Sequence, residues 1–183
     1  LNMADIARKL AQVPLGDRGL LHAGAALLGV AFLAKAALWP LNFWLPSAYA
    51  AASAPSAAMF AVLTKVGVYA ILRLWTLCFP ATAGDSALYG GAALLLGGLF
   101  TAGFGAIGML GSQQLGRLAG YSVITTSGTL LAAMSLDLPE VTGAALLYLA
   151  SSTLGAAALF LLVELVERGR ALEVDPPSAD DRE

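Results

Sequence analysis

Long apolar runs, separated by short polar stretches, fill most of the chain between residues 20 and 168. Each run approaches or exceeds the roughly 20 residues that a helix needs to cross the hydrocarbon core of a bilayer. The pattern therefore predicts an all-α, polytopic membrane helix bundle. Five transmembrane helices are expected, over 20–45, 54–77, 88–110, 117–136 and 141–167.

The two ends of the chain follow other patterns. Within residues 1–19, Met3, Ile6, Leu10 and Val13 recur at steps of three and four residues among charged side chains, which is typical of an amphipathic helix. We interpret 1–19 as a connector at the membrane surface. Residues 169–183 are rich in charge and proline, and we expect a solvated, disordered loop or tail there.

The first apolar run is interrupted by two prolines. Pro40 removes a backbone donor and clashes with the preceding helical turn, so a kink or break is expected near it. The apolar run resumes after Pro40 and stops at Pro46. Broken helices at membrane depth are tolerated mainly where the backbone faces protein or a water-filled space. We therefore expect Pro40 and Pro46 to mark a break close to a functional region.

Composition supports the membrane class and excludes several others. The chain is 58% hydrophobic and 12% charged, whereas a soluble domain carries roughly 25% charged residues. A net charge of -2 offers no basic surface for nucleic acid. One cysteine and one histidine cannot form an internal disulfide, a multi-cysteine metal site or a catalytic triad. We expect no catalytic residue, no metal ligand and no cofactor, and hence a protein of the lipid bilayer rather than an enzyme.

Two lysines lie inside the apolar runs. Lys35 and Lys65 have no acidic residue near them in sequence, because none occurs between Gly19 and Gly84. An ionisable side chain at membrane depth costs about 2.5–3.5 kcal/mol on insertion scales, so it needs a polar partner, water or a function. We interpret the two lysines as the proton-relay groups of an ion or proton pathway. The alternative is that each lysine extends its long stem to the membrane interface.

Hydroxyl-bearing side chains at membrane depth could order water beside the lysines. Alternatively, they could simply hydrogen-bond to carbonyls of their own helices. The candidates for a supporting role are Thr64, Tyr69, Tyr121, Thr125, Ser151 and Ser152.

Three segments resemble a known family. Residues 35–46, KAALWPLNFWLP, resemble the signature of the antiporter-like membrane subunits that respiratory complex I shares with the multisubunit Mrp-type cation/proton antiporters. Residues 60–73, FAVLTKVGVYAILR, resemble the D subunit of the Mrp antiporters in particular. Residues 115–122, LGRLAGYS, are similar to the family's basic-Leu-x-x-Tyr-Ser motif.

The resemblance implies that the chain is the central fragment of an antiporter-like fold of roughly 14 helices. In that fold Lys35 would match the central relay lysine beside a broken helix, and Lys65 the next lysine of the relay. The resemblance also implies that the ends carrying Arg117 and Arg168 face the cytoplasm. The acidic partner of Lys35 would lie on an earlier helix outside this chain. Where complex I relatives often carry a histidine in the eleventh helix, this chain has Ser151 and Ser152.

The function implied is proton conduction in a subunit of a Na⁺, K⁺ or Li⁺/proton antiporter. Such a subunit would lie in the cell inner (plasma) membrane, within a hetero-oligomeric complex of other membrane subunits. A proton at one lysine would disfavour a proton at the other, so the two would exchange protons as a coupled pair. Two alternatives remain: a proton-pumping subunit of complex I, and a structural scaffold subunit of a membrane complex.

Overall fold

The computed structural model describes residue 9 and residues 15–80, 83 and 86–174. Over these residues the chain is helical and forms no β-strand, which confirms the all-α prediction. A short 3-10 helix, η1 (Leu15–Asp17), precedes α2. The α-helices are α2 (Arg18–Lys35), α3 (Trp44–Ala51), α4 (Ala54–Cys78), α5 (Gly91–Gly111), α6 (Leu115–Met134) and α7 (Pro139–Val174).

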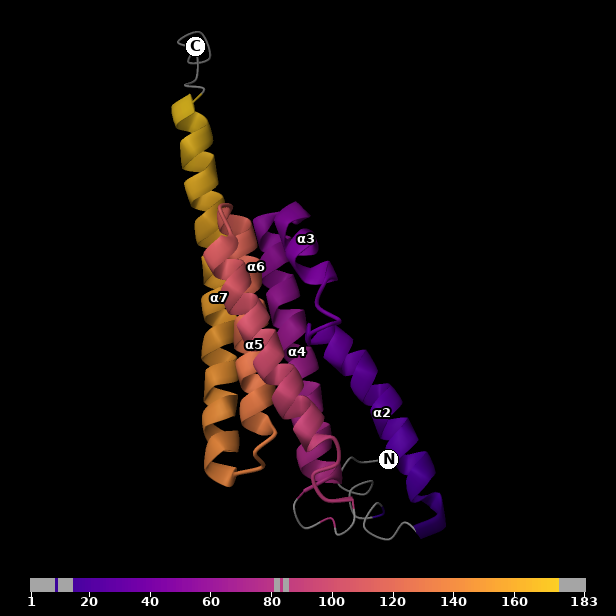
Figure 1. Ribbon diagram of the computed structural model, residues 1–183. Coiled ribbons are helices and arrows are strands. Elements are labelled where there is room, and N and C mark those ends of the chain that lie inside the picture. The colour runs from indigo at the N-terminus through magenta and orange to yellow at the C-terminus, as the bar shows by residue number, and fades with distance from the viewer. Residues whose placement is uncertain (1–8, 10–14, 81–82, 84–85, 175–183) are drawn as a thin grey trace.

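The long helices α4, α5, α6 and α7 run side by side, with successive helices pointing in opposite directions (Figure 1). α2 leans away from this bundle, and α3 continues in the general direction of α2 toward the end of the bundle at which α4 and α6 begin (Figure 1). α7 extends past the other helices at that end (Figure 1). The chain is therefore a helix bundle in which α2 and α3 together make one broken crossing.

Four described helices are long and apolar enough to cross a membrane: α2, α4, α5 and the 139–170 part of α7. We expected five such spans. The fifth, α6, has 20 residues and lies among the others, but it is not one of these four. The physical reason is its composition, because hydroxyl side chains occupy much of its length and lower its hydropathy. Four of these hydroxyls bond to carbonyls of α6 itself, as Thr125 Oγ1 does to the Tyr121 carbonyl at 3.0 Å.

The contact between α5 and α6 is so close that their backbones touch. A Cβ atom added at Gly128 would collide with the Ala102 backbone nitrogen, and one added at Gly98 would lie 2.5 Å from the Ala132 nitrogen. Small residues are the usual means by which membrane helices approach each other closely, because lipid gives no hydrophobic drive for association. This contact fixes the rotation of α6, and so fixes which of its hydroxyls face α4.

Large apolar side chains are exposed over much of the outside of the bundle. Leu27 is 75% exposed, Leu110 90% and Leu147 77%. An exterior of this kind suits contact with lipid or with further membrane helices, and not with water. The membrane location expected from the sequence is confirmed by these apolar helices.

The break in the first crossing is confirmed, but it begins earlier than expected. α2 ends at Lys35, five residues before Pro40, and α3 starts at Trp44. Within the break Ala37 is buried with a positive φ of 58°, and the Trp39–Pro40 peptide is cis.

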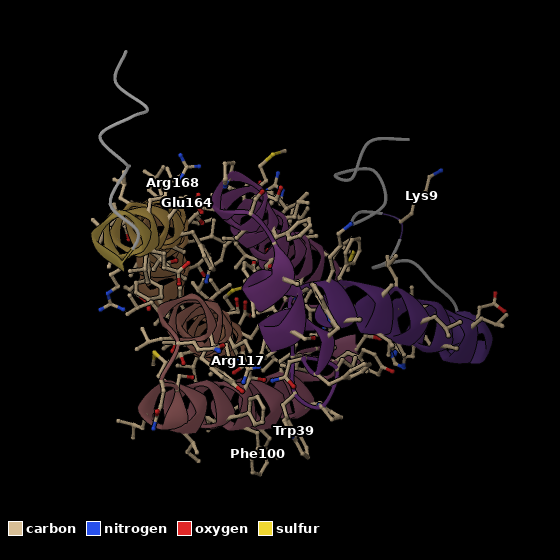
Figure 2. The ribbon with its side chains drawn as sticks, turned by 90° about the horizontal axis from the view of Figure 1, so that it is seen from above. Lys9, Trp39, Phe100, Arg117, Glu164 and Arg168 are labelled. Atoms are coloured by element: carbon tan, nitrogen blue, oxygen red, sulfur yellow. The ribbon has the colours of Figure 1, made fainter. Side chains whose placement is uncertain are left out.

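The break segment is held against α5, since the Trp39 backbone N–H donates to Thr101 Oγ1 at 2.8 Å. The Trp39 and Phe100 rings, both labelled in Figure 2, lie 5.8 Å apart. Pro46 does not end a helix here. It lies in the first turn of α3, where a missing N–H costs little because first-turn N–H groups have no partner within the helix.

The ends of the chain differ from expectation where they are described. The expected tail, 169–183, was wrong for residues 169–174, because α7 continues to Val174. No proline occurs in this stretch before Pro176, and Arg, Ala, Leu and Glu are good helix formers. Residues 175–183 lie outside the described residues. So does most of the expected surface connector 1–19, namely 1–8 and 10–14.

Candidate functional site

Among the described residues, Lys65 is the charged residue that is buried inside the bundle. It lies near the middle of α4 and is 1% exposed. Its Nζ atom donates to Thr126 Oγ1 at 2.6 Å and to Ser127 Oγ at 3.4 Å, both on α6. Within the described part of the chain, no carboxylate makes an ion pair with Lys65. The amine is therefore held by neutral hydroxyl oxygens, with no counter-charge from the part of the chain that the structure describes.

The sequence of α4 explains why this lysine is buried. Ala57, Ala61, Thr64 and Val68 recur at three- and four-residue steps and are all buried, so this face of α4 packs on its neighbours. Lys65 lies beside this face, and its amine reaches α6. An ammonium has three N–H donors, and here two hydroxyl oxygens accept from it.

The main partner of Lys65 lies at the wall of an open groove. This groove, with a volume of about 330 Å³, runs between α6 and α7. Thr126 lines it together with Ser122, Ser151 and Ser152. Ser151 and Ser152 donate to the carbonyls of Tyr148 and Leu149 on their own helix, at 3.1 and 3.3 Å. Their oxygen lone pairs remain as acceptors, so the groove leads from the lysine's hydrogen-bond partner along a wall that can bind water or a proton carrier.

Lys35 occupies a different environment. It is the last residue of α2 and is exposed at the surface of the described bundle. Its backbone packs on α4, where a Cβ added at Gly67 would lie 3.0 Å from the Ala36 nitrogen and 3.3 Å from Lys35 Cβ. The two lysines therefore lie at neighbouring levels of α4. We expected both to be buried, and the structure buries only Lys65.

The other polar residues selected from the sequence divide into two groups. Thr64 is buried, donates to the Phe60 carbonyl at 3.0 Å and lies 3.3 Å from the Tyr49 hydroxyl. Ser151 and Ser152 line the groove described above. These three residues lie beside the core of the candidate site.

Tyr69, Tyr121 and Thr125 are placed elsewhere. Tyr69 is 44% exposed and has no side-chain hydrogen bond to any described residue. Tyr121 and Thr125 pack on the glycines of α5, where a Cβ at Gly108 would collide with the Tyr121 ring. Their contacts are with α5, and neither hydroxyl binds Lys65.

Sequence reasoning missed the two hydroxyls that hold the lysine, Thr126 and Ser127, and also Tyr49. The hydroxyls of α6 occur on several sides of the helix, so the pattern alone does not say which of them face α4. Tyr49 follows the helix break by only a few residues and carried no signal beyond being aromatic. Among the described residues, no group of three or more His, Cys, Asp or Glu side chains could hold a metal ion.

Comparison with known proteins assigns this chain to a family. Residues 8–175 match the family described as NADH:quinone oxidoreductase/Mrp antiporter, transmembrane. A protein of Rhizobium meliloti (strain 1021), named as the D subunit of a probable K(+)/H(+) antiporter, is 57% identical over 175 residues, which cover 96% of this chain and 32% of that protein.

Two more distant relatives carry different names. The D subunit of the Na(+)/H(+) antiporter of Alkalihalophilus pseudofirmus is 36% identical over 92% of the chain and 33% of that protein. The N subunit of the NADH-quinone oxidoreductase of Mycobacteroides abscessus is 28% identical over 91% of the chain and 30% of that protein. The chain thus spans about a third of the length of these relatives. With a matched segment that includes the broken crossing, the buried lysine and all the long helices, this chain belongs to the NADH:quinone oxidoreductase/Mrp antiporter transmembrane family.

Proposed function

We propose that this chain is the central, proton-conducting part of a subunit of a monovalent cation/proton antiporter, and that Lys65 and Lys35 carry the proton. The observation that carries the proposal is Lys65: an amine 1% exposed, held by two hydroxyls and paired with no described carboxylate. A permanently charged lysine at this depth would be costly without a counter-ion. We therefore propose that the Lys65 amine gains and loses a proton during each transport cycle.

The surroundings of the two lysines support different roles for them. Lys35 lies at the surface of the described bundle, where α2 ends and the helix break begins, and other parts of a longer chain can reach it there. A carboxylate supplied there would hold a proton on Lys35, and its withdrawal would release that proton toward Lys65. From Lys65 the proton leaves along Thr126 and the serine-lined groove between α6 and α7.

The names of the relatives favour an antiporter over the complex I alternative. The relative named as the D subunit of a K(+)/H(+) antiporter is 57% identical, whereas the N subunit of the NADH-quinone oxidoreductase is 28% identical. The resemblance of residues 60–73 to the Mrp D subunit agrees with this order. We therefore propose exchange of protons for Na⁺, K⁺ or Li⁺ in the plasma membrane, within a complex of several membrane subunits.

The test replaces Lys35 and Lys65 separately by alanine in the complete subunit, assembled with its partners. Proton movement into inverted membrane vesicles is followed by quenching of a pH-sensitive dye after addition of Na⁺, K⁺ or Li⁺. Both variants are expected to assemble normally and to lose cation-dependent proton exchange. Lys9→Ala, an exposed lysine outside the bundle, is the matched control. Wild-type exchange by both variants would contradict the relay, and unchanged activity of Lys65→Met would favour the scaffold alternative.

A further inference from the structure

A second polar space lies at the end of the bundle where α4 and α6 begin. It is a cavity of about 400 Å³ between α3, α4, α6 and the outer part of α7. Glu164 and Arg117 are among its lining residues, and Figure 2 shows them from above the bundle. The polar side chains around the cavity come from the start of α6, the turn before it and α7: Gln113, Gln114, Arg117, Glu164, Glu167 and Arg170.

The charges at this rim have both signs, and one of them is already paired. Glu164 accepts a hydrogen bond from Arg168 Nε at 2.7 Å, within an ion pair whose arginine is 74% exposed. Exposed ion pairs of this kind are screened by water and contribute little to the stability of the fold. Among the described residues the rim is therefore polar and charged, and it is not a closed salt-bridge network.

The floor of the cavity is aromatic. Tyr49 of α3 stacks on Phe160 of α7, with ring centroids 4.9 Å apart and planes inclined by 16°. The two residues are 2% and 3% exposed. The Tyr49 hydroxyl lies 3.3 Å from Thr64 Oγ1, and Thr64 directly precedes Lys65 on α4. The stack thus lies between the polar cavity and the stretch of α4 that carries the buried lysine.

We propose that this cavity is the aqueous access route to Lys65 from one face of the membrane, and that the Tyr49–Phe160 stack is its gate. The inference rests on the proposed function, since it assumes that Lys65 must exchange protons with water. What passes the gate is a proton on water. The Tyr49 hydroxyl is the first polar group that it meets below the rim, followed by the Thr64 hydroxyl.

The position of α3 explains how such a gate can move. α3 has only 8 residues and is joined to α2 by the non-helical segment 36–43 and to α4 by residues 52 and 53. Phe160, in contrast, belongs to the 36-residue helix α7. A small displacement of α3 therefore separates the rings without breaking a long helix. The residues packed around the stack are mainly small, as Ala57, Ala61 and Ala119 are.

The test measures access and does not depend on transport. In the full-length complex, with Cys78 and other native cysteines replaced by serine, Thr64→Cys is labelled with a membrane-impermeant methanethiosulfonate reagent added to either face of vesicles. With the stack intact, labelling is expected to be slow and to come from the face of the cavity. Phe160→Ala is expected to raise the labelling rate about tenfold, which corresponds to about 1.4 kcal/mol in favour of the open arrangement.

Two controls give the result its meaning. Glu167→Cys, at the rim, should be labelled rapidly whether or not Phe160 is replaced. Tyr49→Phe keeps the ring and loses the hydroxyl, so it should leave the labelling of Thr64→Cys slow. If Phe160→Ala does not assemble, Phe160→Leu is measured in the same way and is expected to give a smaller increase.

The proposal is overturned if replacement of Phe160 leaves the labelling rate unchanged, or if Thr64→Cys reacts only from the opposite face. The same measurements in a Lys65→Ala background separate the two proposals. The labelling pattern should persist there even though exchange is lost, so a failure of the gate and a failure of the relay give different results.

Discussion

The Lys65 ammonium and the Thr126 hydroxyl lie 2.6 Å apart across the contact between α4 and α6. Thr126 is also part of the wall of the groove between α6 and α7. One hydrogen bond therefore joins a buried amine to a polar, open space. Four consequences of this arrangement and of the packing that holds it can be tested.

Replacement of Thr126 by valine removes the shorter of the two hydrogen bonds to Lys65 and keeps the shape of the side chain. Leaving a buried donor with fewer acceptors costs about 1–3 kcal/mol. We expect a lower thermal stability of the purified complex and slower cation-dependent proton exchange, whereas Thr126→Ser should restore both. Thr129→Val is the matched control, because this exposed hydroxyl bonds only to the Thr125 carbonyl on its own helix. Equal effects at positions 126 and 129 would contradict a special role for the bond to Lys65.

Replacement of Gly67 by alanine tests the contact that places Lys35. The added Cβ would lie 3.0 Å from the Ala36 nitrogen and 3.3 Å from Lys35 Cβ, so the end of α2 must move away from α4. We expect proton exchange in vesicles to fall while the amount of assembled complex changes little. Gly24→Ala, at a position of α2 with no atom within 4 Å, should leave exchange unaltered. An unchanged exchange rate for Gly67→Ala would show that the position of Lys35 is not critical.

Replacement of Gly128 by alanine tests the packing of α5 on α6. The added Cβ would collide with a backbone nitrogen of α5, which no side-chain movement can relieve. Overpacking of this kind costs about 1–3 kcal/mol, and we expect a lower unfolding temperature in detergent. Gly103→Ala, on the open side of α5, should be neutral or slightly stabilising. If the two variants unfold at the same temperature, the close approach of the two backbones is not a source of stability.

Two adjacent glycines at the start of α5 give a further contrast. Gly90 has a φ of +73° at the N-cap of α5, and an L-residue in this left-handed region costs about 1–2 kcal/mol. Gly91 begins the helix with ordinary space around a Cβ, 3.7 Å from the nearest side-chain atom. We expect Gly90→Ala to lower the unfolding temperature and Gly91→Ala to leave it unchanged or raise it. The reverse order would contradict the left-handed turn.

The sequence by itself determined the features that depend on local chemistry. Runs of apolar residues fix the long helices because a backbone in lipid must satisfy its own hydrogen bonds, and this holds whichever helix lies alongside. The sequence also marked a break near Pro40, and it singled out Lys65 because a charge in such a run is rare. Even here, α2 ends at Lys35 and Pro46 lies inside α3, since the packing of the break against α5 sets the helix ends.

Only the tertiary structure decided which polar residues meet. Thr125 and Thr126 are neighbours of the same type, yet Thr125 packs on the glycines of α5 and Thr126 binds Lys65. The close contact at Gly128 sets the rotation of α6, and a rotation of one residue, about 100°, would exchange their roles. Burial of Lys65 and exposure of Lys35 were decided in the same way, because burial depends on which helices pack against each lysine and not on the apolar residues that flank it in the chain.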